Sequence, residues 1–187
     1  MRITSGKARG ISLKSPRGDA TRPATDAARQ ALFSSLGDFV DGAVVYDVFA
    51  GTGSYGLEAL SRGAKSAVFF ERGREALACL RANIESVGRA VGGIDARVVP
   101  GDAFSGALPP GLPAPDLVFA DPPYEVLLRD AASVLGLLRR FASGGGLVAL
   151  EAPAEFELPG DCGFEVLRRL GKKGRGKPSQ IVMRVAE

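Results

Sequence analysis

Apolar runs that alternate with amphipathic segments from residue 43 onward constrain the fold more than any other feature of this sequence. Residues 43–50 (AVVYDVFA) are almost uninterruptedly apolar, which is typical of a strand buried on both faces of a sheet. Strands that alternate with helices predict an α/β fold with a mostly parallel, doubly wound sheet. Strands are predicted at residues 43–50, 66–72, 96–103, 116–123 and 144–152, with a closing hairpin at 164–170 and 180–186. Helices are predicted at residues 54–64, 74–88 and over most of 124–143.

The first residues of the chain depart from this alternation. Two short, partly alternating runs surround Gly6 and Gly10, which favours a small β-hairpin with its basic side chains outward. We therefore predict a basic N-terminal hairpin extension over residues 1–24 and one α/β domain over residues 25–187. A chain of 187 residues is long enough to bury the core of one such domain.

A helix is predicted between this extension and the first buried strand. Thr25 is a suitable N-cap, Asp26 favours the positive end of the helix dipole, and Gly37 ends the helix. The side chains expected to face the core are Ala28, Leu32, Phe33 and Leu36.

The hexapeptide GTGSYG, residues 51–56, follows the first predicted strand and opens a helix. Gly51 and Gly53 fit G-x-G-x-x-G, a pattern of dinucleotide sites, and Glu71 stands where a carboxylate accepts from ribose hydroxyls. Asp47, at the strand end, is unfavourable beside a pyrophosphate but favourable beside an ammonium or sulfonium ion. Asp102, after the third strand, is placed to accept from an adenine amine. The turn therefore indicates an adenosine-bearing cofactor, with a tight turn that serves packing alone as the alternative.

The tetrapeptide Asp121-Pro122-Pro123-Tyr124 directly follows the apolar strand LVFA. Two prolines hold the backbone extended and remove two N–H donors. Carbonyl oxygens, a carboxylate and an aromatic ring remain at the strand end. Such a site selects a flat group that carries N–H donors, as a nucleobase amine does.

The complete absence of histidine narrows the possible chemistry. It excludes Ser-His-Asp and Cys-His catalysis, HExxH zinc sites and histidine general bases. The two cysteines, Cys79 and Cys162, belong to no CxxC pair, so we expect free thiols, with Cys79 on a buried helix face, and no metal. Neither a secretory signal nor a long apolar run is found, so we expect a cytoplasmic protein.

Positive charge gathers at the two ends of the chain. Residues 1–29 hold seven Lys and Arg against two acids, residues 161–187 hold seven against three, and the residues between them are net acidic. Basic ends on an acidic middle indicate contact with a polyanion, although basic tails are often only solvated. The candidate RNA-binding residues are Arg2, Lys7, Arg9, Lys14, Arg17, Arg22, Lys172, Lys173, Arg175 and Lys177.

Three quoted stretches together resemble a known family. TRPATD (residues 21–26), DVFAGTGSYGLEALSRGA (47–64) and DPPY (121–124) are similar to the RsmD family, bacterial class I S-adenosylmethionine-dependent methyltransferases that modify a guanine N2 in 16S ribosomal RNA. The resemblance runs through nearly the whole chain. It implies a Rossmann-like seven-stranded sheet, S-adenosyl-L-methionine as cofactor, and 16S rRNA or the small ribosomal subunit as partner of a monomer.

The resemblance also assigns roles to individual positions. It implies that Asp121, Pro122 and Tyr124 hold the target base. The implied cofactor-binding residues are Thr25, Asp26, Asp47, Phe49, Ala50, Gly51, Gly53, Glu71, Arg72, Asp102, Ala103 and Asp121. Two positions depart from the family pattern: Ala27 stands where Arg is common, and Arg72 where Asn, Lys or Asp is frequent.

Three alternatives to guanine-N2 methylation remain open from sequence. An adenine-N6 methyltransferase of RNA or DNA shares DPPY. A protein glutamine methyltransferase would not need the basic ends. A dinucleotide-dependent oxidoreductase or a nucleotide-binding module explains the glycine turn and Glu71 but leaves DPPY unused.

Overall fold

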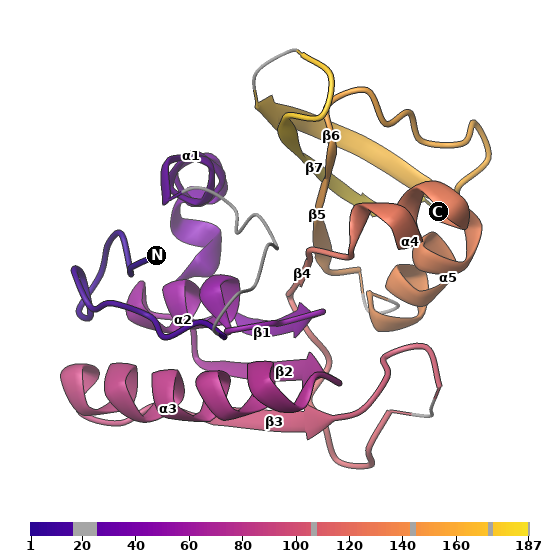
Figure 1. The fold of residues 1–187 in the computed structure, drawn as a ribbon. Coiled ribbons are helices and arrows are strands. Elements are labelled where there is room, and N and C mark those ends of the chain that lie inside the picture. The colour runs from indigo at the N-terminus through magenta and orange to yellow at the C-terminus, as the bar shows by residue number, and fades with distance from the viewer. Residues whose placement is uncertain (17–25, 106–107, 143–144, 172–173, 187) are drawn as a thin grey trace.

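The computed structural model describes residues 1–16, 26–105, 108–142, 145–171 and 174–186, and its sheet has seven strands (Figure 1). Their order is β3-β2-β1-β4-β5-β7-β6. Strands β1 to β5 are parallel, and β7 is antiparallel to both β5 and β6. The strands are β1 (Val44–Val48), β2 (Ser66–Glu71), β3 (Ala96–Pro100), β4 (Leu117–Ala120), β5 (Leu147–Pro153), β6 (Phe164–Gly171) and β7 (Pro178–Val185). The predicted α/β fold is confirmed.

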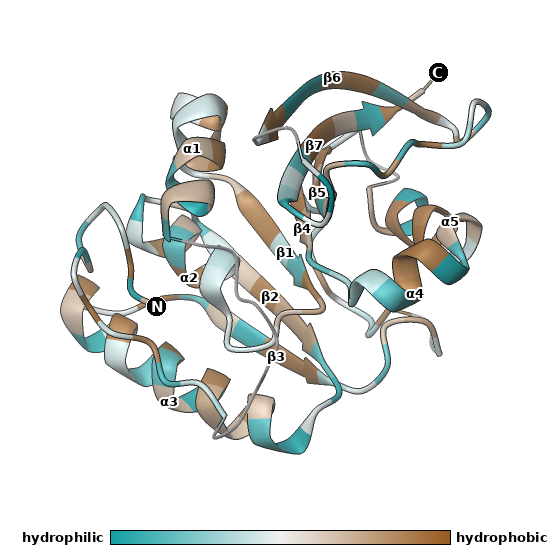
Figure 2. Cartoon of the chain, turned by 45° about the horizontal axis from the view of Figure 1, so that its top comes forward, coloured by the Kyte–Doolittle hydropathy of each residue, from teal (hydrophilic) through white to brown (hydrophobic). Residues whose placement is uncertain are grey.

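Two layers of helices cover the two faces of the sheet. The helices are α1 (Asp26–Leu36), α2 (Ser54–Ser61), α3 (Arg74–Val91), α4 (Tyr124–Arg129) and α5 (Ala131–Phe141), with a 3₁₀ helix η1 (Gly37–Val40) after α1. Helices α1, α2 and α3 share one core cluster with the N-terminal segment, and α4 and α5 share another. Brown apolar strands separate these layers (Figure 2). No helix within the described residues is both long and apolar enough to cross a membrane.

Several element boundaries differ from the sequence-based expectation for physical reasons. Strand β4 ends at Ala120, because the two prolines that follow cannot donate to a ladder. The segment predicted as largely helical, residues 124–143, is two helices that meet at Asp130, whose carboxylate accepts from the Ser133 N–H at 3.0 Å. That side-chain bond caps α5 and starts a new helix instead of continuing α4.

Residues 1–16 fold back on themselves, with an antiparallel bridge between Arg2 and Ser12 and backbone hydrogen bonds from the Ile3 N–H to the Ile11 carbonyl at 2.9 Å and from the Leu13 N–H to the Met1 carbonyl at 3.0 Å. Ile3, Ala8 and Leu13 are buried in the same cluster as α1, α2 and α3, so this segment adds to the main core. It is docked on α2, where the Lys7 N–H donates to the Ser61 carbonyl at 2.8 Å. The predicted boundary between residues 24 and 25 lies outside the described residues and stays a prediction.

Candidate functional site

The glycine turn lies between the carboxyl end of β1 and the first residue of α2. Gly51 and Gly53 have φ angles of 54° and 83°, which side chains disfavour. A Cβ at Gly53 would lie 2.4 Å from the Leu80 side chain, whereas a Cβ at Gly51 would meet nothing within 4 Å. Gly53 therefore allows close packing on α3, and Gly51 leaves open space above the turn. The preceding carbonyl, of Ala50, accepts from the Gly53 N–H at 2.7 Å.

Asp47 is buried on β1 beneath this turn. Its Oδ2 accepts from the Gly56 N–H in the first turn of α2 at 2.8 Å, so the positive end of the helix faces the carboxylate. Burial raises the pKa of Asp47 to about 7, with a smaller rise from the charge of Glu71, while the Gly56 N–H acts in the opposite direction. A bound cation would favour the charged form of this carboxylate.

Glu71, at the end of β2, is joined to the glycine turn. Its Oε2 accepts from the Gly51 N–H at 2.7 Å, and its Oε1 accepts from the Gly73 N–H at 2.6 Å. The structure thus brings together Asp47, Gly51 and Glu71 as the sequence predicts. It also gives Glu71 a structural task that the sequence does not reveal, since the carboxylate fixes the shape of the turn.

Arg72 and Asp102 connect the ends of β2 and β3. The Arg72 Nη1 lies 2.8 Å from the Asp102 Oδ2, and the other carboxylate oxygen accepts from the Phe104 N–H at 3.0 Å. The departure from the family pattern at Arg72 therefore adds a cation directly at the predicted adenine-side carboxylate.

Phe49 has a left-handed backbone at the carboxyl end of β1. Its φ of 64° is the one positive value at a non-glycine position among the described residues. Such backbone costs about 1–3 kcal/mol and is found mostly at functional sites. The Phe49 ring lies 5.7 Å from that of Phe104. A small hollow of about 170 Å³ lies close by, lined by Phe70, Val99, Pro100, Gly101, Asp102, Ala103, Ser105, Leu108, Pro109 and Phe141.

The acceptor loop, Asp121 to Tyr124, leaves the sheet at the end of β4, beside β1. The Asp121 N–H points to the Val48 carbonyl at 3.4 Å, and Tyr124 begins α4. Burial, with the charges of Glu151 and Asp47, holds the pKa of Asp121 well above its usual range. The loop thus places a basic carboxylate and an aromatic ring at the same edge of the sheet as the glycine turn.

Sequence reasoning missed three buried polar residues behind this loop: Tyr55, Glu151 and Gln180. The Tyr55 hydroxyl donates to Glu151 Oε2 at 2.6 Å, and Gln180 Nε2 lies 2.5 Å from that hydroxyl. The available signal was a single acid inside the apolar strand LVALEAP. An isolated acid in such a run is costly to bury without partners.

Asp26 lies at the start of α1 and makes local contacts. Its Oδ1 accepts from the Arg2 N–H at 3.3 Å and from Arg29 Nη2 at 2.9 Å. Arg29 is fully buried, which the sequence did not predict, whereas Ala27 is exposed and Ala28 is half-buried. Leu32, Phe33 and Leu36 are buried as predicted. Thr25 lies outside the described residues.

The predicted basic residues lie in different parts of the molecule. Lys14 lies near the glycine turn, because its carbonyl accepts from Asn83, which also donates to the Thr52 carbonyl. Arg175 and Lys177 precede Pro178, which pairs with Pro153 at the carboxyl end of β5. Arg2 contacts Asp26 at the start of α1. Lys7 and Arg9 lie near Ser61 at the far end of α2. Outside the described residues are Arg17, Arg22, Lys172 and Lys173.

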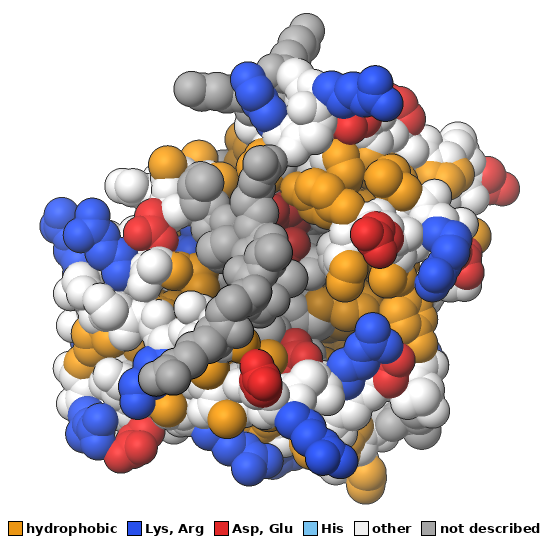
Figure 3. Space-filling view, viewed as in Figure 1, with side chains coloured by type: hydrophobic (Ala, Val, Ile, Leu, Met, Phe, Trp, Pro, Cys, Tyr) orange, Lys and Arg blue, Asp and Glu red, His pale blue; other side chains and the backbone are white. Residues whose placement is uncertain are grey.

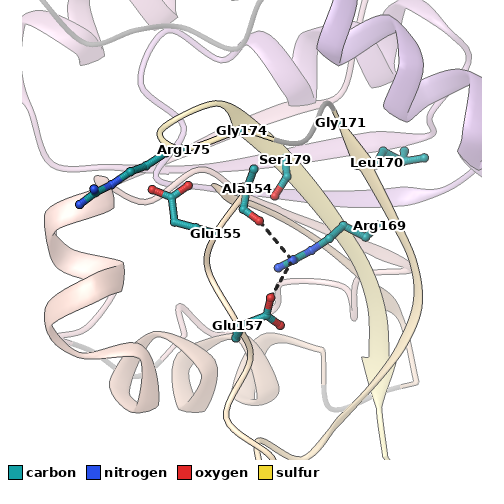
Figure 4. Close-up of a pocket in the computed structure, with 9 residues that line it drawn as sticks. All are labelled: Ala154, Glu155, Glu157, Arg169, Leu170, Gly171, Gly174, Arg175 and Ser179. Carbon is teal, nitrogen blue, oxygen red and sulfur yellow. Dashed lines mark hydrogen bonds and ion pairs between the residues drawn. The ribbon is translucent and has the colours of Figure 1, made fainter.

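A groove of about 440 Å³ lies between the end of β5 and the β6–β7 hairpin (Figure 4). Arg169 crosses it, with Nη1 at 3.5 Å from the Ala154 carbonyl and 3.8 Å from Glu157 Oε1. Arg175 and Glu155 line the same groove. On the face in Figure 3, most Lys and Arg side chains lie toward the periphery, and acidic side chains lie both there and in the middle.

The chain was compared with known proteins. Residues 1–180 match the family described as "Conserved hypothetical protein 95". "Putative rRNA methyltransferase YlbH" of Bacillus subtilis (strain 168) is 33% identical over 180 residues, which are 90% of this chain and 91% of that protein. "Ribosomal RNA small subunit methyltransferase D" of Escherichia coli (strain K12) is 34% identical over 85% of this chain and 78% of its own. The solved structure "Putative methyltransferase yhhF from Escherichia coli" has a TM-score of 0.79 and 32% identity, covering 100% and 98% of the two chains.

Proposed function

Because the chain belongs to the Conserved hypothetical protein 95 family, we propose that it transfers a methyl group from S-adenosylmethionine to the exocyclic N2 amine of a guanine in 16S ribosomal RNA. Family membership confirms the resemblance that the motifs indicated. Methyl transfer to ribosomal RNA is the activity named for both relatives. The observation that carries an exocyclic base amine as the acceptor is the acceptor loop, where the half-buried carboxylate of Asp121 follows β4 and two prolines leave carbonyl acceptors without N–H donors.

The residues at the glycine turn fit S-adenosylmethionine. Asp47 offers a buried carboxylate to a cationic amino acid, and the space above Gly51 is open. Glu71 Oε1 accepts from the Arg72 and Gly73 N–H groups and Oε2 from the Gly51 N–H, so one lone pair of Oε2 is left for a ribose hydroxyl. The hollow beside Asp102 and Ala103 suits a flat adenine ring. When bound, this cofactor supplies a methyl group made electrophilic by its sulfonium sulfur.

The acceptor residues align the amine and take its proton. The Asp121 carboxylate and the Pro122 carbonyl accept the two amine N–H groups, which directs the nitrogen lone pair at the methyl group. The Tyr124 ring stacks on the extruded base. With S-adenosylmethionine bound, the amine nitrogen would take the methyl group as the sulfur–carbon bond breaks, and Asp121 or water would take the amine proton. A carboxylate whose pKa is raised by burial is a stronger base, so histidine is not needed.

The basic groups at the site edge contact the RNA backbone. Lys14, Arg175 and Lys177 are exposed near the site, and the groove at Arg175 adds a concave surface. Each phosphate contact makes the affinity more sensitive to salt. Unstacked loop RNA is preferred to a duplex because its bases are cheaper to extrude.

Product analysis tests this function. The protein is incubated with labelled S-adenosylmethionine and small ribosomal subunits from cells that lack the endogenous enzyme, and the methylated nucleoside is identified after digestion. We expect N2-methylguanosine. Label in N6-methyladenosine would favour the adenine alternative, which shares DPPY, and an absence of label in RNA would refute the proposal.

A further inference from the structure

Glu151 is a buried carboxylate on β5, directly behind the acceptor loop. Its side chain is 3% exposed. Its Oε2 accepts from the Tyr55 hydroxyl at 2.6 Å and from Gln180 Nε2 at 3.2 Å. A buried carboxylate is tolerated only when several donors compensate its lost hydration. The orientation of the Glu151 carboxylate is therefore fixed by at least two hydrogen-bond donors.

The donors to Glu151 are themselves held by packing. The Tyr55 ring stacks on Phe119 of β4, with ring centroids 5.3 Å apart and an interplanar angle of 19°. Gln180 is the register partner of Glu151 across β5 and β7. Tyr55 also belongs to the first turn of α2, whose N–H groups face Asp47. The network thus joins the helix of the cofactor turn to the strand behind the acceptor loop.

Glu151 also contacts the acceptor loop. The Tyr124 hydroxyl is hydrogen-bonded to the Glu151 carboxylate. Tyr124 begins α4, so this bond fixes the ring at the point where the chain leaves the two prolines. A stacked base must meet that ring in one orientation for the amine to face the methyl donor.

We propose that Glu151 is a positioning residue for the acceptor base, holding the Tyr124 ring through its hydroxyl while Tyr55 and Gln180 hold Glu151. This inference rests on the proposed function and deepens it. The target guanine is then oriented by a chain of contacts from α2 and β7 through β5 to the loop. Tyr124 touches the base, and Glu151 acts only through Tyr124 and through its charge.

The charge of Glu151 has a second consequence, for Asp121. Burial is the main cause that raises the pKa of Asp121, and the Glu151 charge is the next. The other groups that face this pair are Asp47 from β1, Tyr55 from α2, Tyr124 from α4 and Arg29 from α1. Removing the Glu151 charge lowers the pKa of Asp121, because one repulsive charge is lost.

The test compares Glu151→Gln, Tyr124→Phe and the double variant in steady-state kinetics with small subunits. For Glu151→Gln we expect kcat to fall about 10- to 100-fold, as misplaced reactants do, with KM for the subunit within about 3-fold. In Tyr124→Phe, kcat should fall by a similar factor. The kcat of the double variant should lie within about 3-fold of the kcat of Glu151→Gln, because both substitutions break the same contact, between Tyr124 and Glu151. Multiplied losses, or an unchanged kcat in either single variant, would overturn the inference.

The pH profile separates positioning from mere structural support. The acid limb of kcat, where Asp121 must lose its proton, should move to lower pH by about 0.5–1 unit in Glu151→Gln and stay in place in Tyr124→Phe. A loss of folded protein alone would lower activity at every pH without moving the limb. An unmoved limb in Glu151→Gln contradicts the inference.

Three controls, a neighbouring variant, thermal unfolding and the wild-type product, separate the possible outcomes of these kinetic tests. Glu125→Gln changes an exposed acid next to Tyr124 and should leave kcat unchanged. If Glu151→Gln does not fold, as thermal unfolding would show, Tyr124→Phe carries the test, and its unchanged kcat would overturn the inference. Wild-type protein that makes no N2-methylguanosine refutes the proposed function itself, whereas active wild type with active Glu151→Gln refutes only the positioning role.

Discussion

Asp47 is a residue whose buried carboxylate suits a bound ligand but lowers the stability of the ligand-free protein. Its carboxylate is 1% exposed and faces the Gly56 N–H, without a cationic side chain bonded to it among the residues that the structure describes. Burial raises its pKa to about 7 from 3.8. Between these two pH values the folded state keeps a proton that the unfolded state releases, so this residue makes stability fall as pH rises through that window.

Asp47→Asn should therefore stabilise the ligand-free protein at pH 8 more than twice as strongly as at pH 5, because only the first part of the window from pH 3.8 to about 7 lies below pH 5. The amide oxygen still accepts from Gly56, while the buried charge is gone. The gain at pH 8 is at most about 4 kcal/mol, from the difference between the folded and unfolded pKa values. Denaturant unfolding at both pH values measures it, with the exposed Asp38→Asn as the control. Equal effects at pH 5 and 8 would contradict the buried-charge interpretation.

The same Asp47→Asn variant should bind S-adenosylmethionine about 10-fold or more weakly at pH 8, because a charge-assisted contact to the ligand is lost. Isothermal titration calorimetry measures this affinity. A variant that is both more stable and weaker in binding would show that the carboxylate is kept for its ligand.

Substitution of Asp121, unlike that of Asp47, should leave the affinity for S-adenosylmethionine nearly unchanged. Asp121→Asn removes the base but leaves the glycine turn intact, so we expect methyl transfer to fall by at least about 100-fold. The affinity for S-adenosylmethionine should stay within a few-fold of wild type. Single-turnover transfer and calorimetry on the same preparation measure the two quantities. A collapse of cofactor affinity would reassign Asp121 from the acceptor to the cofactor.

Residues inside motifs were predictable, whereas buried polar residues outside them were not. Asp47, Gly51 and Glu71 were found because their spacing after a buried strand is specific, and the structure places them together. Arg29 and Glu151 were missed because a buried charge depends on partners far apart in sequence. Arg29 lies within 3.5 Å of Glu58, and Glu151 reaches Tyr55, 96 positions away.

Among the elements, the N-terminal segment makes several of its contacts with α2. Thr4 Oγ1 donates to Glu58 Oε1 at 2.7 Å, and the Ala8 N–H donates to Ser61 Oγ at 2.9 Å. Gly6 lies between these two contacts, against the backbone of α2. The predicted fold-back is present, because the Ile3 N–H donates to the Ile11 carbonyl at 2.9 Å and the Leu13 N–H donates to the Met1 carbonyl at 3.0 Å. The contacts with α2 are additional, and the sequence did not predict them.

Gly6→Ala should detach this segment from α2. Gly6 has a φ of 77°, and an added Cβ would lie 1.9 Å from the Ser61 carbonyl oxygen, a backbone atom that cannot move aside cheaply. Gly10→Ala is the matched control, because its φ of 89° is equally unfavourable but its surroundings are open. We expect a loss of about 1 kcal/mol for Gly10→Ala from backbone strain and at least about 3 kcal/mol for Gly6→Ala.

Denaturant unfolding measures both losses, and limited trypsin digestion at Lys7 and Arg9 reports the local detachment. Equal losses in the two variants would mean that the close approach to Ser61 is not important for stability.

At the scale of the whole molecule, the fold brings one lysine of the basic N-terminal segment and the basic β6–β7 hairpin to one edge of the sheet. Pro178, the first residue of β7, pairs with Pro153 at the carboxyl end of β5, so the hairpin that carries Arg175 and Lys177 lies at the site edge. Lys14 reaches the same edge through Asn83. The charge count predicted a polyanion contact at both ends, but only the fold shows which cations share an edge.

Lys14 and Lys7 therefore provide a matched pair for the RNA-binding surface. Both are exposed lysines of the same segment, but Lys14 lies beside the glycine turn and Lys7 beside the far end of α2. If RNA covers the site edge, Lys14→Ala removes one phosphate contact and should reduce the slope of log affinity against log salt by about 1. Lys7→Ala should leave that slope unchanged, as should Lys65→Ala at the start of β2. Filter binding to a 16S rRNA fragment across salt concentrations measures the slopes, and equal changes for Lys14→Ala and Lys7→Ala would place the RNA across α2 instead.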